Sequence, residues 1–79
     1  MPFVNVRTVK GILTDAQKRE LQDRITDLVV EIEGRGDPSF RRLVWVLIDE
    51  QEPGNWSLGG THVTPELVQR VASRELPKV

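Results

Sequence analysis

The sequence has no cysteine and only one histidine among its 79 residues. Disulfide bonds are therefore excluded, and a His/Cys metal site is not expected. Because a chain this short buries little apolar surface, the sequence predicts one domain over residues 1–79. Small domains without disulfides or metals usually gain stability from a partner subunit, so we expect self-association and no cofactor.

Long apolar runs and an excess of positive charge are also missing. The longest apolar stretch, Leu43 to Ile48, is far short of the roughly 20 residues that cross a bilayer. Eleven Lys and Arg against twelve Asp and Glu give a net charge of −1, which leaves no general positive field for nucleic acid. Residues 1–7 do not contain the apolar run of a signal peptide. We predict a soluble, cytoplasmic protein with neither a membrane nor a nucleic acid as partner.

The first 50 residues have the pattern of a β-α-β unit. Residues 2–9 are β-branched and mixed polar, which predicts a strand. A capping box at residues 14–17 begins a helix that ends near Gly34, with apolar positions at Leu21, Ile25, Leu28, Val29 and Ile32. Residues 41–50 contain an uninterrupted apolar run, which is typical of a central strand covered on both faces. The crossover rule makes this strand parallel to the first.

The remaining residues predict a hairpin-like segment and a second helix. Residues 53–55 form a turn, residues 56–58 are extended, and a double glycine follows. Thr64, Pro65 and Glu66 supply a cap, a first-turn proline and a first-turn acid for a helix over about residues 65–74. The predicted fold class is therefore α/β (α+β), a small subunit whose open sheet edges are completed by oligomerisation.

Pro2 is the unusual residue in chemical terms. Motifs for nucleophilic triads, zinc proteases and phosphate loops do not occur in the sequence. Removal of Met1 would leave the Pro2 nitrogen as a free secondary amine, whereas retention of Met1 would make it a non-basic amide. An α-amino group has a pKa of roughly 7.7–8.0, and that of a proline amine is higher, so a base at neutral pH needs an apolar setting or nearby cations. A Met-Pro start alone does not establish such a role.

Several motifs together resemble the tautomerase superfamily, specifically the 4-oxalocrotonate tautomerase group. They are Pro2 at the head of a strand, Gly11 after it, the helix start at residues 14–18, Ile48-Asp49-Glu50, and the segment from Gly54 to Gly60. Their order and spacing carry the resemblance, which covers about residues 2–60. Residues 61–79 are then a C-terminal helical extension.

The resemblance implies an enzyme without cofactor whose amino-terminal proline is a general base. Such a base takes a proton from an enol or an acidic carbon of a small 2-oxo acid and returns it to another carbon. The resemblance also implies homo-oligomers, hexamers or trimers, with each active site at a subunit boundary. It makes Trp56 the aromatic residue of an apolar pocket and Leu58 and Val9 its aliphatic walls. The family's two arginines are replaced by Ile12 and Trp45, so a dicarboxylate substrate is not expected.

Other residues have two interpretations each. Arg41 and Arg42 precede Trp45, with Arg41 on its strand face, and each is either a carboxylate anchor for a neighbouring subunit or a solvated charge. Trp45 is either a second pocket wall or a core aromatic, and core packing is the commoner fate. Arg7 fits a helix-covered or interface position as well as it fits a site.

Three further residues have weaker assignments. His62 is more often a loop residue than a functional one. Asp49 and Glu50 are candidates for tuning the Pro2 amine or activating water, and the sequence does not decide whether either faces the site.

Three functional hypotheses follow. The first is a tautomerase or isomerase that uses Pro2. The second is a hydratase, dehalogenase or decarboxylase that acts on an unsaturated acid with the same proline. The third is a non-catalytic oligomeric module of the same fold, in which Pro2 supports no turnover.

Overall fold

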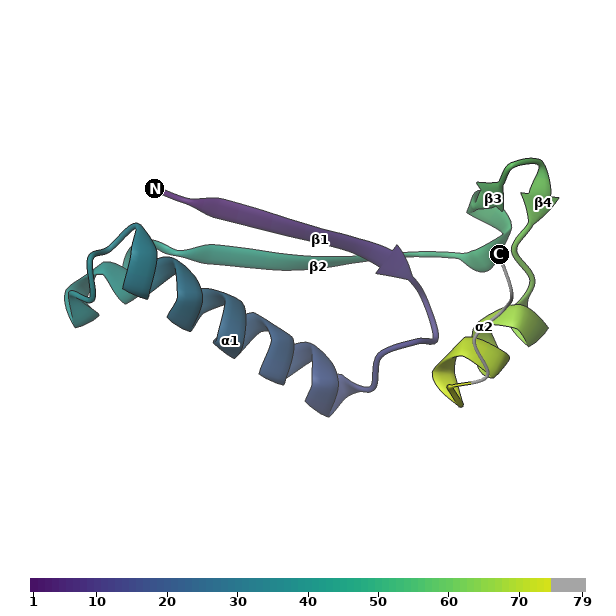
Figure 1. Ribbon diagram of the computed structural model, residues 1–79, viewed down its shortest axis with the longest axis horizontal. Helices are drawn as coiled ribbons and strands as arrows, with labels where there is room; N and C mark the ends of the chain where they lie inside the picture. The colour runs from purple at the N-terminus through teal and green to yellow at the C-terminus, as the bar shows by residue number, and fades with distance from the viewer. Residues whose placement is uncertain (75–79) are drawn as a thin grey trace.

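Two parallel strands joined by a helix form the main body of the protein (Figure 1). The computed structural model describes residues 1–74. Strand β1 (Phe3–Val9) pairs with β2 (Trp45–Gln51) in a continuous register from Phe3 opposite Trp45 to Val9 opposite Gln51. Helix α1 (Asp15–Ile32) makes the crossover between them. The predicted parallel β-α-β unit is confirmed.

Helix α1 begins at the predicted capping box. The Gln17 backbone N–H donates to Thr14 Oγ1 at 3.1 Å, and the Thr14 N–H donates to Gln17 Oε1 at 2.9 Å. The helix ends at Glu33, and Gly34 behind it is buried. A Cβ atom on Gly34 would lie 2.7 Å from both Phe40 Cγ and the Val30 carbonyl oxygen. Glycine is therefore needed here because Phe40 packs directly onto the backbone.

The predicted start of the second strand was wrong. Residues Pro38–Leu43 form the 3₁₀ helix η1, and β2 begins only at Trp45. Asp37 caps this helix by accepting a hydrogen bond from the Ser39 N–H at 3.0 Å, and Pro38 occupies its first turn. Proline and an Asp cap favour a helical turn over an extended chain. Arg41 and Arg42 consequently lie in η1 and not on a strand face.

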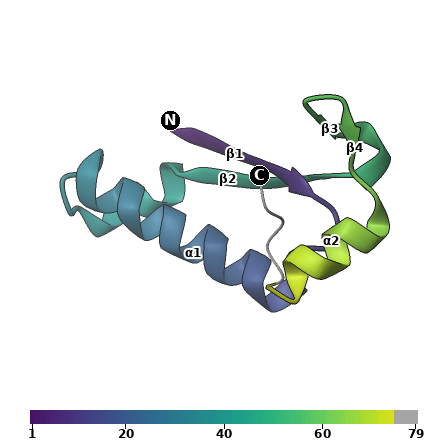
Figure 2. The same ribbon diagram turned by 45° about the vertical axis from the view of Figure 1, so that its right-hand side comes forward.

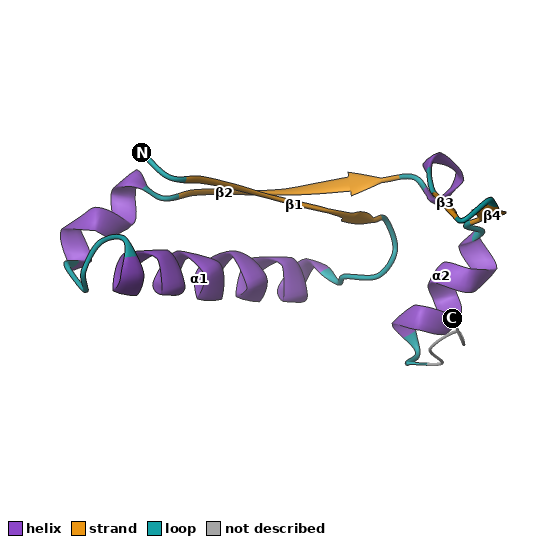
Figure 3. Cartoon of the chain, turned by 45° about the horizontal axis from the view of Figure 1, so that its top comes forward, coloured by secondary structure: helices purple, strands orange, loops and turns teal. Residues whose placement is uncertain are grey.

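Helix α1 covers one face of the sheet, and the other face is open in the single chain (Figure 3). Along β1 the even-numbered Val4, Val6 and Thr8 are partly buried, whereas Phe3, Asn5 and Arg7 are exposed. The prediction of a second strand covered on both faces is therefore not met within one chain. Two residues of the predicted apolar side of α1 are also largely exposed, Leu28 at 54% and Ile32 at 70%.

The last elements lie beyond the carboxyl end of β2 (Figure 1). A 3₁₀ turn η2 (Pro53–Asn55) leads into the antiparallel hairpin of β3 (Ser57–Leu58) and β4 (Thr61–His62), where the turn and the extended segment were predicted. The assignment of residues 61–62 to the helical extension was wrong, because they pair with β3 across the double glycine. Helix α2 (Pro65–Ala72) starts at the predicted cap, where Thr64 Oγ1 accepts from the Leu67 N–H at 3.2 Å. It lies beside the loop that joins β1 to α1 (Figure 2), with Val68 Cγ1 3.1 Å from a Cβ built on Gly11. The last five residues of the predicted extension, 75–79, lie outside the described residues.

The core of the single chain is small. Among the hydrophobic residues at positions 1–74, Val63 and Val68 alone are buried. The accessible surface is 6266 Å², whereas a compact monomer of 9.0 kDa exposes roughly 4,900 Å². Neither helix within the described part of the chain is long and apolar enough to cross a membrane. The chain thus exposes more surface than a compact monomer of its mass, including several large hydrophobic side chains.

Candidate functional site

Pro2 lies at the end of the sheet where both strands begin. Its carbonyl accepts a hydrogen bond from the Trp45 backbone N–H at 3.0 Å, which holds the residue at the head of β1. The side chain is partly buried beside a hollow of about 330 Å³. The lining of this hollow is almost entirely apolar and comprises Pro2, Val4, Leu28, Val29, Ile32 and Glu33. Met1, in contrast, is 80% exposed.

The predicted anchors and Trp45 belong to this same end of the sheet. Arg41 forms an ion pair with Asp27 on the surface of α1. Arg42 is exposed and takes part in no ion pair within residues 1–74. Trp45 is 58% exposed on the open face of the sheet. It is therefore not a core residue of the single chain.

Trp56 lies at the opposite end of the sheet, beside a hollow of about 400 Å³ lined by Arg7, Gln51, Asn55 and Trp56. Its indole Nε1 is buried and has no hydrogen-bond partner among the described residues. Val9 ends β1 at this end of the sheet and is partly buried, and Leu58 in β3 is 62% exposed. The three predicted wall residues thus share one end of the subunit.

Arg7 lies exposed on the open face of the sheet, not under α1, and pairs with Asp49. Its Nε donates to Asp49 Oδ2 at 3.0 Å, and Gln51 Nε2 donates to Asp49 Oδ1 at 2.8 Å. These two hydrogen bonds, first that from Gln51 and then that from Arg7, lower the pKa of the Asp49 carboxyl. The signal available in the sequence was the two-residue alternation that Arg7 shares with Val9.

Asp49 and Glu50 point to different faces of the sheet. Glu50 lies on the α1 side and forms an ion pair with Lys18, and its hydrogen bond raises the pKa of the Lys18 ammonium. Asp49 lies on the open face with Arg7. His62 is exposed in β4 opposite Ser57. Within residues 1–74 no three His, Asp or Glu side chains gather in a way that could hold a metal ion.

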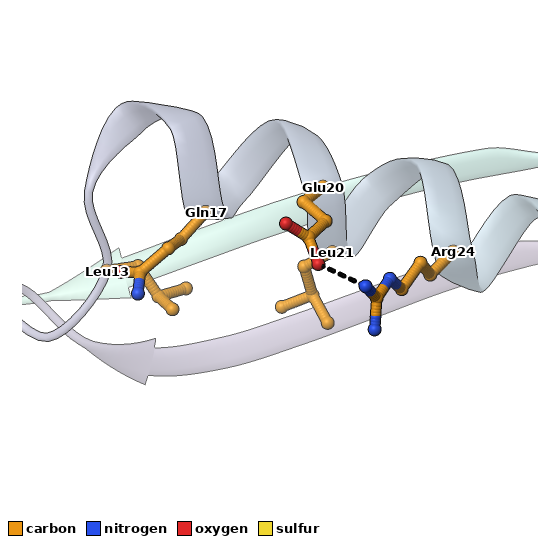
Figure 4. Close-up of a pocket in the computed structure, with 5 residues that line it drawn as sticks. All are labelled: Leu13, Gln17, Glu20, Leu21 and Arg24. Carbon is orange, nitrogen blue, oxygen red and sulfur yellow. Dashed lines mark ion pairs between the residues drawn. The ribbon is translucent and has the colours of Figure 1, made fainter.

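A third hollow, of about 270 Å³, lies beside the first turns of α1 (Figure 4). Figure 4 shows Leu13, Gln17, Glu20, Leu21 and Arg24 following one another along the start of α1, with the Glu20–Arg24 ion pair dashed. Glu20 and Arg24 neutralise each other through an ion pair of 2.7 Å. None of the predicted site residues lines this hollow.

The single chain therefore divides the predicted site between two ends. Pro2 and Trp45 lie at one end, whereas Val9, Trp56 and Leu58 lie at the other. Strands of seven residues span roughly 20 Å at about 3.3 Å per residue. Pro2 cannot contact Trp56 of its own chain across that distance.

Comparison with known proteins places the chain in a family. A family model described as "Tautomerase enzyme" matches residues 2–65. A probable tautomerase K2 from Dickeya dadantii (strain 3937) is 41% identical over 64 residues, which are 81% of this chain and 90% of the relative.

Two solved structures are similar as well. TomN, described as a 4-oxalocrotonate tautomerase homologue in the tomaymycin biosynthetic pathway, matches with a TM-score of 0.66 and 26% identity, over 92% of this chain and 98% of that one. A structure from a study of trans-3-chloroacrylic acid dehalogenase activity matches with a TM-score of 0.61 and 27% identity, over 80% of this chain and 100% of that one. From the family match, the curated relative and the shared fold, we conclude that this chain belongs to the tautomerase family.

Proposed function

We propose that this protein is a tautomerase or isomerase that needs no cofactor and uses Pro2 as general base on a small enol or 2-oxo acid. The observation that carries the proposal is the position of Pro2, at the head of β1 and in the wall of an apolar hollow. Apolar surroundings disfavour a protonated amine, which leaves the nitrogen free to accept a proton. Membership of the tautomerase family supports the same role.

The reaction requires Met1 to be removed. The exposure of Met1 leaves it accessible for that step. The freed Pro2 nitrogen then takes the proton from an enol hydroxyl or an acidic carbon, and the same proton returns to a different carbon. The keto form, or an isomer with a moved double bond, is the product.

The working site is built by more than one copy of the chain. Because Trp56, Leu58 and Val9 lie at the far end of their own subunit, they would wall the Pro2 site of a neighbour. The open sheet face and the small core support such self-association, to a hexamer or a trimer. We expect the assembled protein in the cytoplasm, since the chain has no cysteine.

Substrate carboxylates need a positive group near this site. Arg41 and Arg42 remain candidates because η1 leads directly into β2 at the Pro2 end of the sheet. To bind a substrate carboxylate, Arg41 would have to break or share its ion pair with Asp27. Trp45 is a candidate second wall, exposed on the open face.

A second candidate function uses the same proline on an unsaturated acid as a hydratase, which adds water, as a dehalogenase, which adds water and releases halide, or as a decarboxylase, which releases carbon dioxide. The likeness to the structure from the dehalogenase study favours this alternative specifically. Release of chloride from trans-3-chloroacrylate would distinguish the two reactions. A non-catalytic module would catalyse neither.

The first experiment follows ketonisation of phenylenolpyruvate and 2-hydroxymuconate by ultraviolet absorbance. It compares Pro2→Ala with wild-type protein whose intact mass shows that Met1 has been removed. We expect turnover in the wild type, a preference for the monocarboxylate, and a loss of several orders of magnitude in the variant. Equal rates in the two proteins would exclude Pro2 as the base.

A further inference from the structure

We propose that Arg7, oriented by Asp49 and Gln51, binds the carboxylate of a small monocarboxylic acid in the hollow that it shares with Trp56. The identity of the acid as a 2-oxo acid rests on the proposed function, whereas the binding site itself rests on the geometry of these side chains.

The guanidinium of Arg7 is oriented by Asp49 but keeps N–H donors that a ligand can bind. Its Nε donates to Asp49 Oδ2 at 3.0 Å, and this is the only hydrogen bond of the Arg7 side chain within residues 1–74. The two terminal nitrogens therefore keep their donors. Arginine presents such donors as a rigid planar fork that matches the two oxygens of a carboxylate.

A chain of polar groups fixes this arrangement along the edge of the hollow. Gln51 Nε2 donates to Asp49 Oδ1 at 2.8 Å, and Asn55 Nδ2 approaches Gln51 Oε1 at 3.4 Å. Both oxygens of Asp49 are thus engaged, and the carboxylate is held against Arg7. A side chain fixed in this way loses less conformational freedom when a ligand binds.

Asp49 also limits which ligands the Arg7 guanidinium can bind. The ion pair between Arg7 and Asp49 has no net charge. Attraction to a ligand therefore comes from the direction of the terminal N–H groups more than from long-range charge. Such a group suits one carboxylate and not two, in agreement with the replacement of the family's arginines by Ile12 and Trp45.

Trp56 supplies an independent observation in the same hollow. Its Nε1–H is buried and unpaired in the described part of the chain, although buried donors in proteins are nearly always hydrogen-bonded. Both Trp56 and Arg7 line the hollow, whose volume of about 400 Å³ suits a small ligand. A carboxylate there can accept hydrogen bonds from the guanidinium, and its arrival would change the surroundings of the neighbouring indole.

The indole of Trp56 offers a direct measurement. The ¹⁵N-labelled protein, processed and assembled, is titrated with 2-oxobutanoate while the Trp56 Nε1–H resonance is followed, with Trp45→Phe used only to assign the peak. We expect a saturable shift of this resonance, and at least a tenfold weaker dissociation constant in Arg7→Met. The neutral amide, 2-oxobutanamide, should bind both proteins equally weakly.

Three controls separate binding from folding and from catalysis. Arg7→Lys keeps the charge but loses the planar fork of donors, so we expect an intermediate affinity. If Arg7→Met does not fold, the affinity of Arg7→Lys tests the inference instead. Arg19→Met, which removes an exposed arginine from helix α1, is the matched comparator and should leave the titration unchanged. Pro2→Ala should bind normally, so loss of turnover there with intact binding separates failure of the proposed chemistry from failure of this site.

Two results would overturn the inference. One is an unshifted Trp56 indole in the wild type at saturating 2-oxobutanoate. The other is an Arg7→Lys or Arg7→Met protein, folded by circular dichroism, that binds the acid as tightly as the wild type.

Discussion

Phe3 and Trp45 lie directly opposite each other in the parallel pairing of β1 and β2, and both aromatic side chains remain more than half exposed. Leu47, two residues further along β2, is 47% exposed on the same face. Exposed apolar patches of this kind mark interaction surfaces. The part of the open face around Phe3, Trp45 and Leu47 is therefore where we expect a second copy of the chain to pack.

Leu47→Glu should disrupt the assembly, because a carboxylate would be buried without a partner in the interface. Sedimentation velocity should show a smaller species than the wild type at the same concentration. Ala16→Glu adds the same charge on the exposed surface of α1 and should sediment as the wild type does. A Leu47→Glu protein that sediments as the wild type does would show that the open face around Leu47 is not part of the interface.

Gly34→Ala should destabilise the protein by about 1–3 kcal/mol, the usual cost of overpacking. The added methyl group would lie 2.7 Å from Phe40 Cγ and from the Val30 carbonyl oxygen, so α1 or η1 must shift. Urea denaturation at fixed protein concentration measures the change. Gly54→Ala is the control because nothing lies within 4 Å of its added Cβ. Similar midpoints for the two variants would contradict the close packing of Phe40 on Gly34.

Thr14→Ala should lower the free energy of unfolding by about 1 kcal/mol through loss of the helix cap. The Gln17 N–H would lose its acceptor at the start of α1. Thermal unfolding followed by circular dichroism, with Thr61→Ala in the exposed hairpin as control, measures this effect. Equal melting temperatures of the two variants would show that the capping box contributes nothing measurable to stability.

The ion pair of Asp49 should make stability depend on pH in the acid range. The folded-state pKa of Asp49 lies below its ordinary value of 3.8. Its contribution is therefore fully present above that ordinary value and is lost as the pH falls through the folded-state pKa. The melting temperature of the wild type should exceed that of Asp49→Asn at pH 7, and the difference should shrink as the pH falls below 3.8 and through the folded-state pKa. A difference that persists undiminished at pH 2 would show that the carboxylate charge is not its cause.

Elements with local signals could be predicted from the sequence. The capping box at Thr14, the cap at Thr64 and the turn before the hairpin each act within a few residues, so their outcome does not depend on distant contacts. The start of β2 was misplaced because the apolar run hid a second local signal, the cap and proline at Asp37 and Pro38. For the same reason Arg41 was predicted on a strand face, whereas it lies in η1 and forms an ion pair with Asp27.

The sequence by itself determined the β-α-β order and the helix ends, because periodicity and caps are local properties, and its resemblance to a family singled out Pro2 as the candidate base. Tertiary structure decided which of these residues meet. The register of β1 on β2 brings Arg7 to Asp49, 42 positions away, and the direction of the strands separates Pro2 from Trp56. Such pairings depend on how distant segments pack together, and no pattern within a single segment records that.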